Sequence, residues 1–545
     1  MNYKKYEDEV IPAKVFTKLG DIRIDGRTLT IKVLCPAKNF KWTGLMLSYN
    51  YKIDEDREDY LLYPTKKEKV GKHVEITCKV DLEKFPFRMV HWSFKALYEE
   101  DGYYHQAKVL QQTKKKMNIF RFLLKKDNYT TGDGHIVFVY IGSGGQVMLR
   151  YREKSKYDGM GIRWKECLAR VYVKLNQKKL ASRKIYLVYE KKCEKAQDNG
   201  YHFFCYCMEH NMEEYLNREI YYVIDKSSID RKKLDAYSDH VLDFMSLKFL
   251  ITILSCDLLI SSDARAHAYI WQNQQSVVAS QIRKKKHVFL GHGVLALKRL
   301  NDSFSAKNMR SSLCTATSEA EARVIREEMG FKHHEVAITG YARFDALYDT
   351  SGDKKEILVM PTHRSWLFGV EREVFTASNY YKRYMDLLNS PELLAKLEEN
   401  DVTLNFYLHP SIGEHVDAFT STSDRVQIVP YGKYALDDLM MQCKLLVTDY
   451  SSVAWDVYYM GKPIIFYQYD LQAYLDTWGS YIDLEKDSPG ERVETHNELI
   501  TAIESYIDNG FVMKPEYEAK REEHYEFIDH NNSQRICDVL KARGL

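Results

Sequence analysis

The hydrophobic pattern changes twice along the chain. The first part shows short β-type segments separated by turn signals such as Asp-Gly and Gly-Ser-Gly-Gly. A basic stretch follows, in which Trp164, Leu168, Val171 and Leu175 recur at helical spacing. Beyond it, short apolar runs alternate with helical patterns to the end of the chain. The pattern therefore predicts a small β-sandwich or barrel, a basic helical connector and a long α/β region.

The long α/β region contains enough strand candidates for two domains. Alternation of strands and helices implies parallel sheets with helices on both faces. Ligands of such sheets bind beyond the carboxyl ends of the strands. We expect two Rossmann-like domains, with the break between them near residues 310–335. The strand candidates are residues 185–190, 220–224, 257–261, 287–290, 335–339, 357–360, 404–408, 444–448 and 463–467.

These patterns give four expected parts. They are a β-rich accessory module at residues 1–150, a basic helical connector at 151–183, an N-terminal Rossmann-like domain at 184–325 and a C-terminal Rossmann-like domain at 326–545.

Composition and charge exclude several classes of protein. The chain of 545 residues has 79 Lys and Arg against 77 Asp and Glu, a balance that argues against nucleic acid as its partner. Its ten cysteines form no Cys-x-x-Cys pair, which favours free thiols in a reducing cytoplasm. The start of the sequence has no apolar signal core, and no run of 18 apolar residues occurs. We expect a cytoplasmic protein that, if it works at a membrane, lies on its surface.

The strongest local signal surrounds Ser451 and Ser452. An apolar strand ends at Thr448-Asp449, and the two serines open a helix that we expect to run to about Met460. The start of a helix offers unpaired backbone N–H groups and the positive end of the helix dipole, and both favour the binding of a phosphate. The alternative is that both serines only cap the helix. Asp456, one turn later, suits a neutral partner such as a ribose or polyol hydroxyl.

Histidines and arginines follow several other predicted strands. His292 stands between two glycines, so its imidazole is accessible and suited to remove a proton from a hydroxyl. His409, Arg343 and Arg364 each follow a further strand. We expect these cationic donors and the start of the Ser451 helix to converge on one cleft. Such an arrangement favours the binding of a pyrophosphate.

Together these motifs resemble the CDP-glycerol glycerophosphotransferase family, whose members prime and polymerise wall teichoic acids and related capsule polymers. The resemblance covers about residues 184–530, and the Asp-Tyr-Ser-Ser stretch followed by Lys-Pro-Ile-Ile-Phe-Tyr is its most specific part. The other motifs that carry it are Ala196-Gln197-Asp198-Asn199-Gly200, Gly291-His292-Gly293 with Lys298, Gly340-Tyr341-Ala342-Arg343, Pro361-Thr362-His363-Arg364 and Leu408-His409-Pro410.

The resemblance implies a fold of the glycosyltransferase-B type. The first Rossmann-like domain would bind the acceptor and the second the CDP-polyol, and the C-terminal helix would return to the first. The implied reaction transfers glycerol-phosphate or ribitol-phosphate from CDP-glycerol or CDP-ribitol to a lipid-linked polymer, with release of CMP. The protein would act peripherally on the cytoplasmic face of the membrane. The sequence leaves a homo-oligomer possible.

The resemblance also implies roles for individual residues. His292 would be the catalytic base and His409 a second catalytic group. The implied donor-binding residues are Arg343, Pro361, Thr362, Arg364, Ser451, Ser452 and Asp456. No cofactor is required, because the CDP-polyol is a substrate. No metal is implied either, since Asp54-Glu55-Asp56 is interpreted as solvated surface.

Some positions depart from the family pattern and leave the polyol open. Val294-Leu295-Ala296 replace Thr-Pro-Leu, Ala342 replaces a proline, and His363 stands where tryptophan is common. Two alternative functions also stay open: a nucleotide-sugar glycosyltransferase or epimerase on the same fold, and a non-catalytic scaffold.

Two basic stretches are candidates for contact with an anionic membrane leaflet. Residues 113–126 place Phe120, Phe122, Leu123 and Leu124 among six Lys or Arg, and residues 151–184 are the second candidate. For the first stretch, the alternative is an element of the β-rich module with a solvated basic face.

Overall fold

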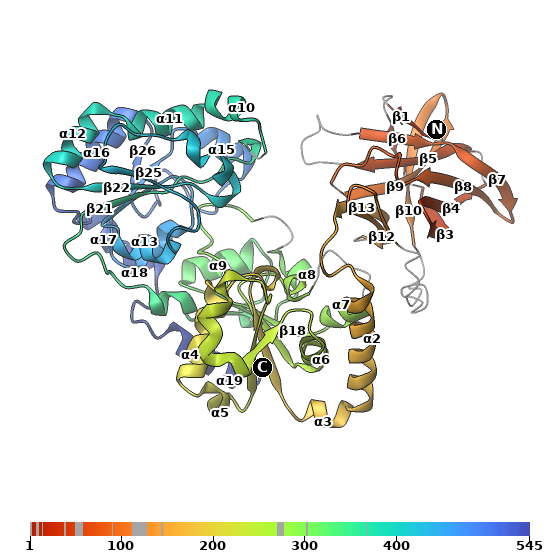
Figure 1. Cartoon of the computed structure of the whole chain (residues 1–545), viewed down its shortest axis with the longest axis horizontal. Helices are drawn as coiled ribbons and strands as arrows, with labels where there is room; N and C mark the ends of the chain where they lie inside the picture. The colour runs from red at the N-terminus through yellow and green to blue at the C-terminus, as the bar shows by residue number, and fades with distance from the viewer. Residues whose placement is uncertain are drawn as a thin grey trace. The chain divides into compact units, whose positions relative to one another are not determined.

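The computed structural model describes residues 3–6, 10–13, 15–37, 40–49, 58–89, 91–111, 128–142, 145–269, 277–300, 304–367 and 369–545. It divides into two units, of which one comprises Met1–Gln177, Met245–Leu254 and Tyr269–Lys284, and the other Lys178–Phe244, Ser255–Ala268 and Lys285–Leu545. Figure 1 colours the chain from its N-terminus in red to its C-terminus in blue. Each unit is described below by itself.

The N-terminal part is β-rich, as the turn signals predicted. Its main sheet has the strand order β1-β6-β5-β9-β10-β3-β4-β8-β7, and β11, β12 and β13 extend it through β9. Apolar side chains of β4, β5, β8 and β9 share one core. The strands are β1 (Tyr3–Tyr6), β2 (Ile11–Pro12), β3 (Thr17–Asp25), β4 (Thr28–Pro36), β5 (Lys41–Tyr49), β6 (Glu58–Leu62), β7 (Pro64–Val70), β8 (His73–Asp81), β9 (His91–Glu100), β10 (Tyr103–Leu110), β11 (Asn128–Thr130), β12 (His135–Ile141) and β13 (Val147–Glu153).

A parallel sheet of seven strands forms the centre of what we call the first lobe. Its order is β16-β15-β14-β17-β18-β19-β20, and every neighbouring pair is parallel. Consecutive residues of β18 enter two separate apolar cores, so both faces of this sheet are covered. The strands are β14 (Ile185–Tyr189), β15 (Glu219–Ile224), β16 (Val241–Asp243), β17 (Leu258–Ser261), β18 (Lys286–Phe289), β19 (Leu313–Ala316) and β20 (Val336–Ile338).

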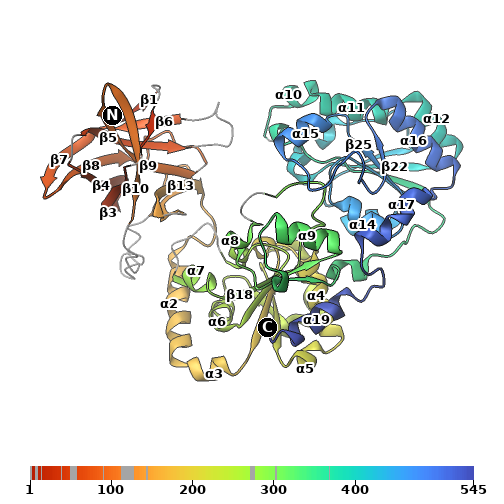
Figure 2. The same ribbon diagram turned by 180° about the vertical axis from the view of Figure 1, so that it is seen from behind.

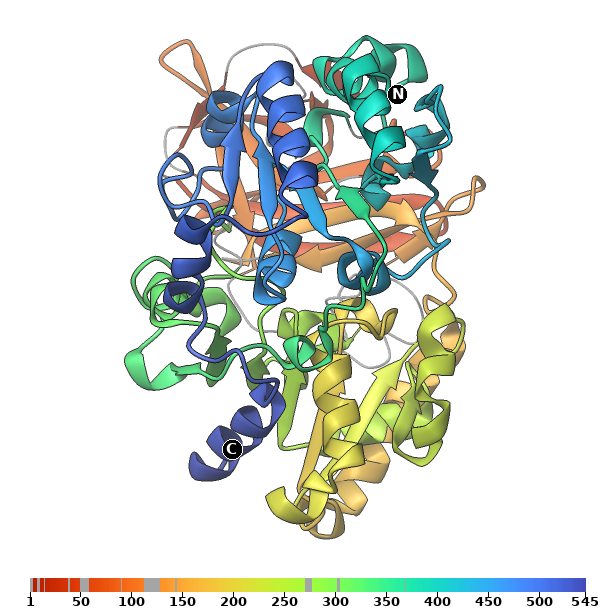
Figure 3. The same ribbon diagram turned by 90° about the vertical axis from the view of Figure 1, so that its left-hand side faces the viewer.

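A second parallel sheet, of six strands, forms the second lobe. Its order is β23-β22-β21-β24-β25-β26. Helices α11, α12 and α16 share a core with one face, and α13 and α14 share a core with the other (Figure 3). The strands are β21 (Glu356–Val359), β22 (Thr403–Tyr407), β23 (Val426–Val429), β24 (Leu445–Thr448), β25 (Ile464–Tyr467) and β26 (Glu491–Val493).

Helices lie between the strands of the two parallel sheets and also follow the β-rich part (Figure 2). They are α2 (Met160–Leu175), α3 (Gln177–Ala181), α4 (Asn199–Glu209), α5 (Met212–Leu216), α6 (Leu247–Ser255), α7 (Val277–Ile282), α8 (Ala306–Met309), α9 (Glu319–Glu327), α10 (Arg372–Ala377), α11 (Asn379–Leu388), α12 (Pro391–Glu399), α13 (Leu436–Gln442), α14 (Val453–Tyr459), α15 (Leu471–Thr477), α16 (His496–Asp508), α17 (Pro515–Ala519), α18 (Arg521–His524) and α19 (Asn532–Ala542). Short 3₁₀ helices include η3 (Lys191–Cys193), η8 (Ala342–Ala346) and η10 (Pro410–Ala418).

The expected boundary between the two α/β parts, after residue 325, is wrong. Strand β20 pairs with β19 through three residues, and it therefore belongs to the first sheet. The chain leaves the first lobe only after Ile338. A strand of three residues is too short to be assigned to one sheet from its hydrophobic pattern, which explains the error. The β-rich part likewise runs slightly beyond residue 150, since β13 ends at Glu153.

The last helix connects the two lobes. After the second sheet, the chain crosses to the first lobe, where α19 packs against α4 and α5 (Figure 2). Asp345 caps this helix, because its carboxylate accepts hydrogen bonds from the backbone N–H groups of Asn532 and Ser533 at 2.8 and 2.7 Å. The two lobes are thus tied together by segments far apart in sequence.

Candidate functional site

His292 lies in a tight loop just after β18. Gly291 has a φ of +74°, and a Cβ atom there would lie 2.5 Å from the ring of Tyr341. A Cβ atom on Gly293 would lie 2.8 Å from Oγ of Ser452. Gly291 is therefore required by its positive φ and by its close approach to Tyr341. Gly293 is required by its close approach to Ser452. The loop of His292 and the start of α14 thus lie directly against each other.

The imidazole of His292 is held by a carboxylate. Its Nδ1 lies 2.5 Å from Oδ2 of Asp198, while 64% of the His292 side chain is exposed. Because Nδ1 is engaged by Asp198, Nε2 is the nitrogen left to meet a substrate. The charge of Asp198 and its hydrogen bond raise the pKa of His292 to about 9.

Asp198 is itself fixed by its surroundings. It is the residue before the first turn of α4, and its Oδ1 accepts a hydrogen bond from the backbone N–H of Asn199 at 2.8 Å. The carboxylate of Glu190 accepts the backbone N–H groups of Gln197, Asp198 and Tyr201 and thereby orders the whole segment. The orientation of His292 is therefore set through Asp198.

Arg343 contacts carboxylates of both lobes next to this pair. Its guanidinium donates to both carboxylate oxygens of Asp456, at 2.7 and 3.1 Å, and to Oδ1 of Asp198 at 3.1 Å. Arg343 and Asp456 are both buried. The carboxylate on α14 is therefore neutralised by an arginine from η8, in the segment that connects the two lobes. A phosphate close to Ser452 would meet a paired Asp456 rather than an isolated negative charge.

Arg364 is paired with two carboxylates of the second lobe. Its guanidinium is buried and donates to Asp449 at 2.8 Å, to Asp470 at 2.8 and 3.0 Å, and to the carbonyl of Thr362. Those contacts occupy all three guanidinium nitrogens. Arg364 therefore holds the loops that follow β21, β24 and β25, and its contact with the donor stays a prediction.

The remaining predicted donor residues gather around the carboxyl ends of β21 and β24. The backbone N–H of Thr362, next to Pro361, donates to Asp449 at 2.8 Å. The Thr362 hydroxyl is buried and has no hydrogen-bond partner within the described ranges. Ser451 and Ser452 lead into α14, which has seven residues and is therefore somewhat shorter than expected. Ser452 is exposed and makes no capping hydrogen bond through its side chain.

His409 follows β22 and lies beside His363, with ring centroids 4.3 Å apart. Burial, together with the positive charges of Lys191 and Lys298, lowers the pKa of His409 to about 4. A histidine with this pKa is neutral at pH 7 and can donate or accept a hydrogen bond there. Its role in catalysis stays a prediction.

Sequence reasoning assigned no role to Asp198 and Asn199, although both lie in a quoted motif. The side chain of Asn199 donates to the carbonyl of Gly291 and accepts the backbone N–H of Arg343, both at 3.0 Å. It thereby joins the His292 loop to η8. The sequence did offer a signal for these two residues, because they form a polar pair at the start of a helix that follows a parallel strand. Such a pair is equally typical of simple helix capping, so it did not indicate a functional role.

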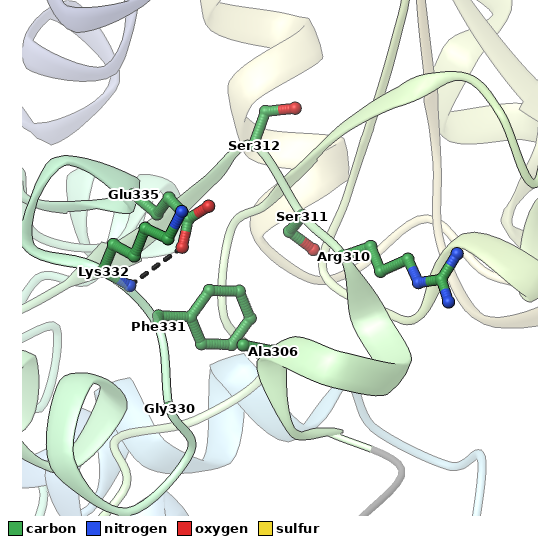
Figure 4. A pocket seen from close by; sticks show the side chains of 8 residues that line it. All are labelled: Ala306, Arg310, Ser311, Ser312, Gly330, Phe331, Lys332 and Glu335. Atoms are coloured by element: carbon green, nitrogen blue, oxygen red, sulfur yellow. Dashed lines mark hydrogen bonds between the residues drawn. The ribbon is translucent and has the colours of Figure 1, made fainter.

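A separate cavity of about 350 Å³ lies elsewhere in the first lobe (Figure 4). It lies next to the amino-terminal ends of β19 and β20, whereas His292 follows the carboxyl end of β18. None of the predicted site residues lines it. The lining residues are Ala306, Arg310, Ser311, Ser312, Gly330, Phe331, Lys332 and Glu335.

Two expectations about metals and membranes concern parts of the chain that the structure does not describe. Asp54-Glu55-Asp56 and the basic stretch 113–126 both lie outside the described residues. Among the residues that are described, no cluster of three or more His, Cys, Asp or Glu could hold a metal ion. None of the described helices has the length and apolarity needed to cross a bilayer.

All ten cysteines are free thiols.

With this geometry in place, comparison with known proteins defines the class. The chain belongs to the CDP-glycerol:poly(glycerophosphate) glycerophosphotransferase family, whose sequence profile matches residues 172–541. It is 27% identical to the minor teichoic acid biosynthesis protein GgaB of Bacillus subtilis (strain 168) over 361 residues, which are 64% of this chain and 38% of that protein. It is 25% identical to the teichoic acid ribitol-phosphate polymerase TarL of Staphylococcus aureus (strain NCTC 8325 / PS 47), over 47% of this chain and 48% of that one.

A third relative is the teichoic acid glycerol-phosphate primase of Bacillus subtilis (strain 168), 28% identical over 42% of this chain and 56% of that protein. The chain thus spans about half the length of the curated relatives that it matches. Among solved structures, the wall teichoic acid polymerase TagF superposes with a TM-score of 0.50 at 15% identity, over 71% of this chain and 98% of that one. That similarity concerns the fold.

Proposed function

We propose that the protein transfers glycerol-phosphate or ribitol-phosphate from a CDP-polyol to a hydroxyl of a lipid-linked, teichoic-acid-like or capsule polymer. The observation that carries this proposal is the His292–Asp198 pair, whose loop lies against Ser452, in a chain of this family. The pair supplies a base held in one orientation, and the neighbouring helix start supplies N–H and hydroxyl donors for a phosphate.

We infer that the two lobes are Rossmann-like domains of the glycosyltransferase-B type. The strand orders, renumbered within each sheet, are 3-2-1-4-5-6-7 and 3-2-1-4-5-6, and the latter is the order of dinucleotide-binding folds. Helices cover both faces of both sheets. In this arrangement the first lobe binds the acceptor and the second binds the CDP-polyol, and the substrates meet at the carboxyl ends of the strands.

The proposed chemistry is a displacement at the β-phosphorus of the donor. The acceptor hydroxyl oxygen forms a bond to this phosphorus while the bond to the bridging oxygen breaks, and CMP leaves with the bonding electron pair. His292 takes the hydroxyl proton at Nε2. Positioning and electrostatic stabilisation dominate phosphoryl transfer, so fixed donors around the diphosphate matter as much as the base. No cofactor is needed, because the activated donor supplies the energy.

The donor contacts follow from the same arrangement. Thr362 with Pro361 and Ser451 with Ser452 border the proposed CDP-polyol site, and His409 lies at the end of the adjoining strand β22. Arg343 keeps Asp456 and Asp198 in place across the lobes.

Product analysis tests the proposal. The protein is incubated with CDP-glycerol or CDP-ribitol and a synthetic lipid-linked acceptor, and products are weighed by mass spectrometry. CMP release with an acceptor extended by one or more polyol-phosphate units is expected. Release of UDP from a UDP-sugar, with no CMP from either CDP-polyol, would instead support a glycosyltransferase.

We also propose that the protein works on the cytoplasmic face of the membrane, and α2 supports this. Its residues Trp164, Leu168, Val171 and Leu175 are 54%, 55%, 57% and 79% exposed and form one stripe. Basic side chains, among them Lys165 and Lys174, flank the stripe. An apolar stripe with basic flanks suits an anionic leaflet, where a lipid-linked acceptor is held.

A further inference from the structure

Lysines are concentrated at the carboxyl-terminal edge of the first sheet. Residues 191–196 follow β14, and residues 225–233 follow the neighbouring parallel strand β15. We call these two segments the lysine edge. They contain seven Lys or Arg against three Asp or Glu, a net charge of +4, whereas the whole chain carries +2. The remainder of the chain is therefore slightly acidic, and positive charge gathers here.

The two segments of the lysine edge form one surface. The backbone N–H of Asp225 donates a hydrogen bond to the carbonyl of Cys193 at 2.6 Å. The hydroxyl of Ser228 donates to the carbonyl of Glu194 at 2.7 Å. Because these bonds join the backbones of the two segments directly, their lysines belong to one continuous stretch of surface.

Most of the positive charge on the lysine edge is not paired within the protein. Two of the three acidic residues, Asp225 and Asp230, are buried. Arg231 and Lys233 are paired with carboxylates, at 3.2 and 3.1 Å. Across the part of the chain that the structure describes, no further ion pair involves either segment. The lysines that this leaves without a carboxylate partner are Lys191, Lys192, Lys195, Lys226 and Lys232.

The lysine edge adjoins the proposed catalytic pair. Lys195 precedes Asp198 by three residues, so their Cα atoms are at most about 11 Å apart. Asp198 in turn lies 2.5 Å from Nδ1 of His292. Toward the second lobe, Nζ of Lys195 lies 3.4 Å from the hydroxyl of Tyr431, which follows β23. The lysines therefore lie where the first lobe, the proposed acceptor lobe, borders the site.

The acceptor of the proposed reaction has the charge that this surface lacks. Its polyol-phosphate units are joined by phosphodiesters, and each phosphodiester carries one negative charge at neutral pH. Lysine binds phosphate as a point charge. One exposed contact of this kind contributes little by itself. Several lysines along one edge can meet several phosphates of the same chain, however, and linked contacts reinforce one another.

Resting on the proposed function, we propose that the lysine edge binds the phosphodiester chain of the acceptor polymer, next to the terminal hydroxyl that His292 deprotonates. The surface then favours acceptors that already carry several polyol-phosphate units. An anionic membrane leaflet would also attract lysines, but it favours an apolar stripe beside them, as on α2. The large apolar side chain that these two segments expose is Ile229 alone, so the polymer fits the surface better.

Fluorescence anisotropy of the full chain with a labelled, water-soluble oligomer of several glycerol-phosphate or ribitol-phosphate units tests binding without catalysis. Lys191→Gln/Lys226→Gln removes two exposed, unpaired charges and should weaken binding about three- to tenfold, as expected for two exposed charge contacts. The dependence of Kd on salt should also become less steep. The matched control is Lys286→Gln/Lys332→Gln, which removes two exposed lysines at the opposite, amino-terminal edge of the same sheet and should bind like the wild type.

Turnover gives a second measurement. Synthetic lipid-linked acceptors that carry one polyol-phosphate unit or several are compared in the assay of CMP release. In Lys191→Gln/Lys226→Gln the KM for the longer acceptor should rise more than the KM for the shorter one, because only the longer acceptor reaches the lysines. A general loss of folded protein would lower kcat for both acceptors equally and would leave this ratio unchanged.

The outcomes separate this inference from the proposed function. Equal Kd and equal salt dependence in the wild type and both double variants would overturn the lysine edge, while CMP release from a CDP-polyol would still support the function. If the oligomer binds through the lysine edge but neither CDP-polyol yields CMP, the polyanion site stands and the proposed function fails. Unchanged oligomer binding together with weaker flotation on anionic vesicles in Lys191→Gln/Lys226→Gln would assign the surface to the membrane instead.

Discussion

The Nδ1 atom of His292 lies 2.5 Å from Oδ2 of Asp198, and the other oxygen of that carboxylate accepts a hydrogen bond from Arg343. Asp198 thus connects the proposed base with the arginine that pairs with Asp456. In this group two carboxylates face one arginine and one histidine. The charges balance when His292 is protonated, which is why the Asp198 charge raises the pKa of His292 to about 9.

The pH dependence of turnover should report this pair. A base acts only when deprotonated, so kcat/KM of the wild type should rise with pH up to about 9. Asp198→Asn removes the charge that raises the pKa, and the rise should move toward 6.5, the ordinary pKa of the imidazole. Stopped assays of CMP release from pH 5.5 to 10 measure both profiles. Identical profiles in the two proteins would show that Asp198 does not tune His292.

Removal of the imidazole should lower turnover without loss of the fold. General-base assistance typically contributes about 10²- to 10⁴-fold, and His292→Ala should lose that factor in kcat. Since 64% of the side chain is exposed, little packing is lost. Urea denaturation checks the fold, and His334→Ala, at an exposed position in the first lobe, serves as the control. Near-normal turnover of His292→Ala would exclude it as the base.

The parallel strands were predictable from the sequence because each is buried on both faces and forms a continuous apolar run. Ile357 to Val359 in β21 and Leu445 to Val447 in β24 are examples. The three-residue strand β20 was also predicted, as residues 335–339, but its pattern does not show to which sheet it belongs, so the boundary between the lobes was placed too early. His292 was predicted as the base because glycines on both sides of a histidine at a strand end are an unusual combination, and its role stays a prediction.

The partners of charged residues could not be predicted in the same way. Asp198 is 94 residues from His292, and Asp449 and Asp470 are 85 and 106 residues from Arg364. An arginine after a strand therefore looks the same in sequence whether it meets a ligand or a buried carboxylate. Only the fold shows that the Arg364 guanidinium forms ion pairs with two carboxylates.

Loss of Arg364 should destabilise the protein strongly. Removal of one partner from a buried ion pair leaves uncompensated charge and typically costs about 3–5 kcal/mol. Arg364→Met would leave Asp449 and Asp470 facing each other, and the midpoint of urea denaturation should fall accordingly. The double variant Arg364→Met/Asp449→Asn should recover part of that loss, because one buried charge is removed. A loss below about 1 kcal/mol, the range of exposed pairs, would contradict a structural role.

The exposed stripe of α2 should bind anionic vesicles. Leu168→Glu and Val171→Glu place negative charge in the stripe and should abolish most flotation with liposomes rich in anionic lipid. Gln177→Glu adds the same charge at an exposed position outside the stripe and should reduce flotation only slightly. Equal loss in all three variants would indicate a general charge effect. Equal flotation of wild type and Leu168→Glu would place membrane contact elsewhere on the chain.

The approach of Gly293 to Ser452 should be essential for bringing the base to the donor. A Cβ atom on Gly293 would lie 2.8 Å from Oγ and 3.0 Å from Cβ of Ser452, so Gly293→Ala must push the His292 loop and the start of α14 apart. Because small displacements of reacting groups are costly, kcat/KM should fall about tenfold or more.

A double-variant cycle identifies this steric origin. Ser452→Gly removes both atoms that an added methyl group would meet, although it also removes a proposed donor contact. The double variant Gly293→Ala/Ser452→Gly should therefore retain more activity than the product of the single effects predicts, with a coupling of about 0.5–3 kcal/mol. Measurement of kcat/KM in all four proteins gives this coupling. Strictly additive losses would mean that the two residues do not meet in the working enzyme.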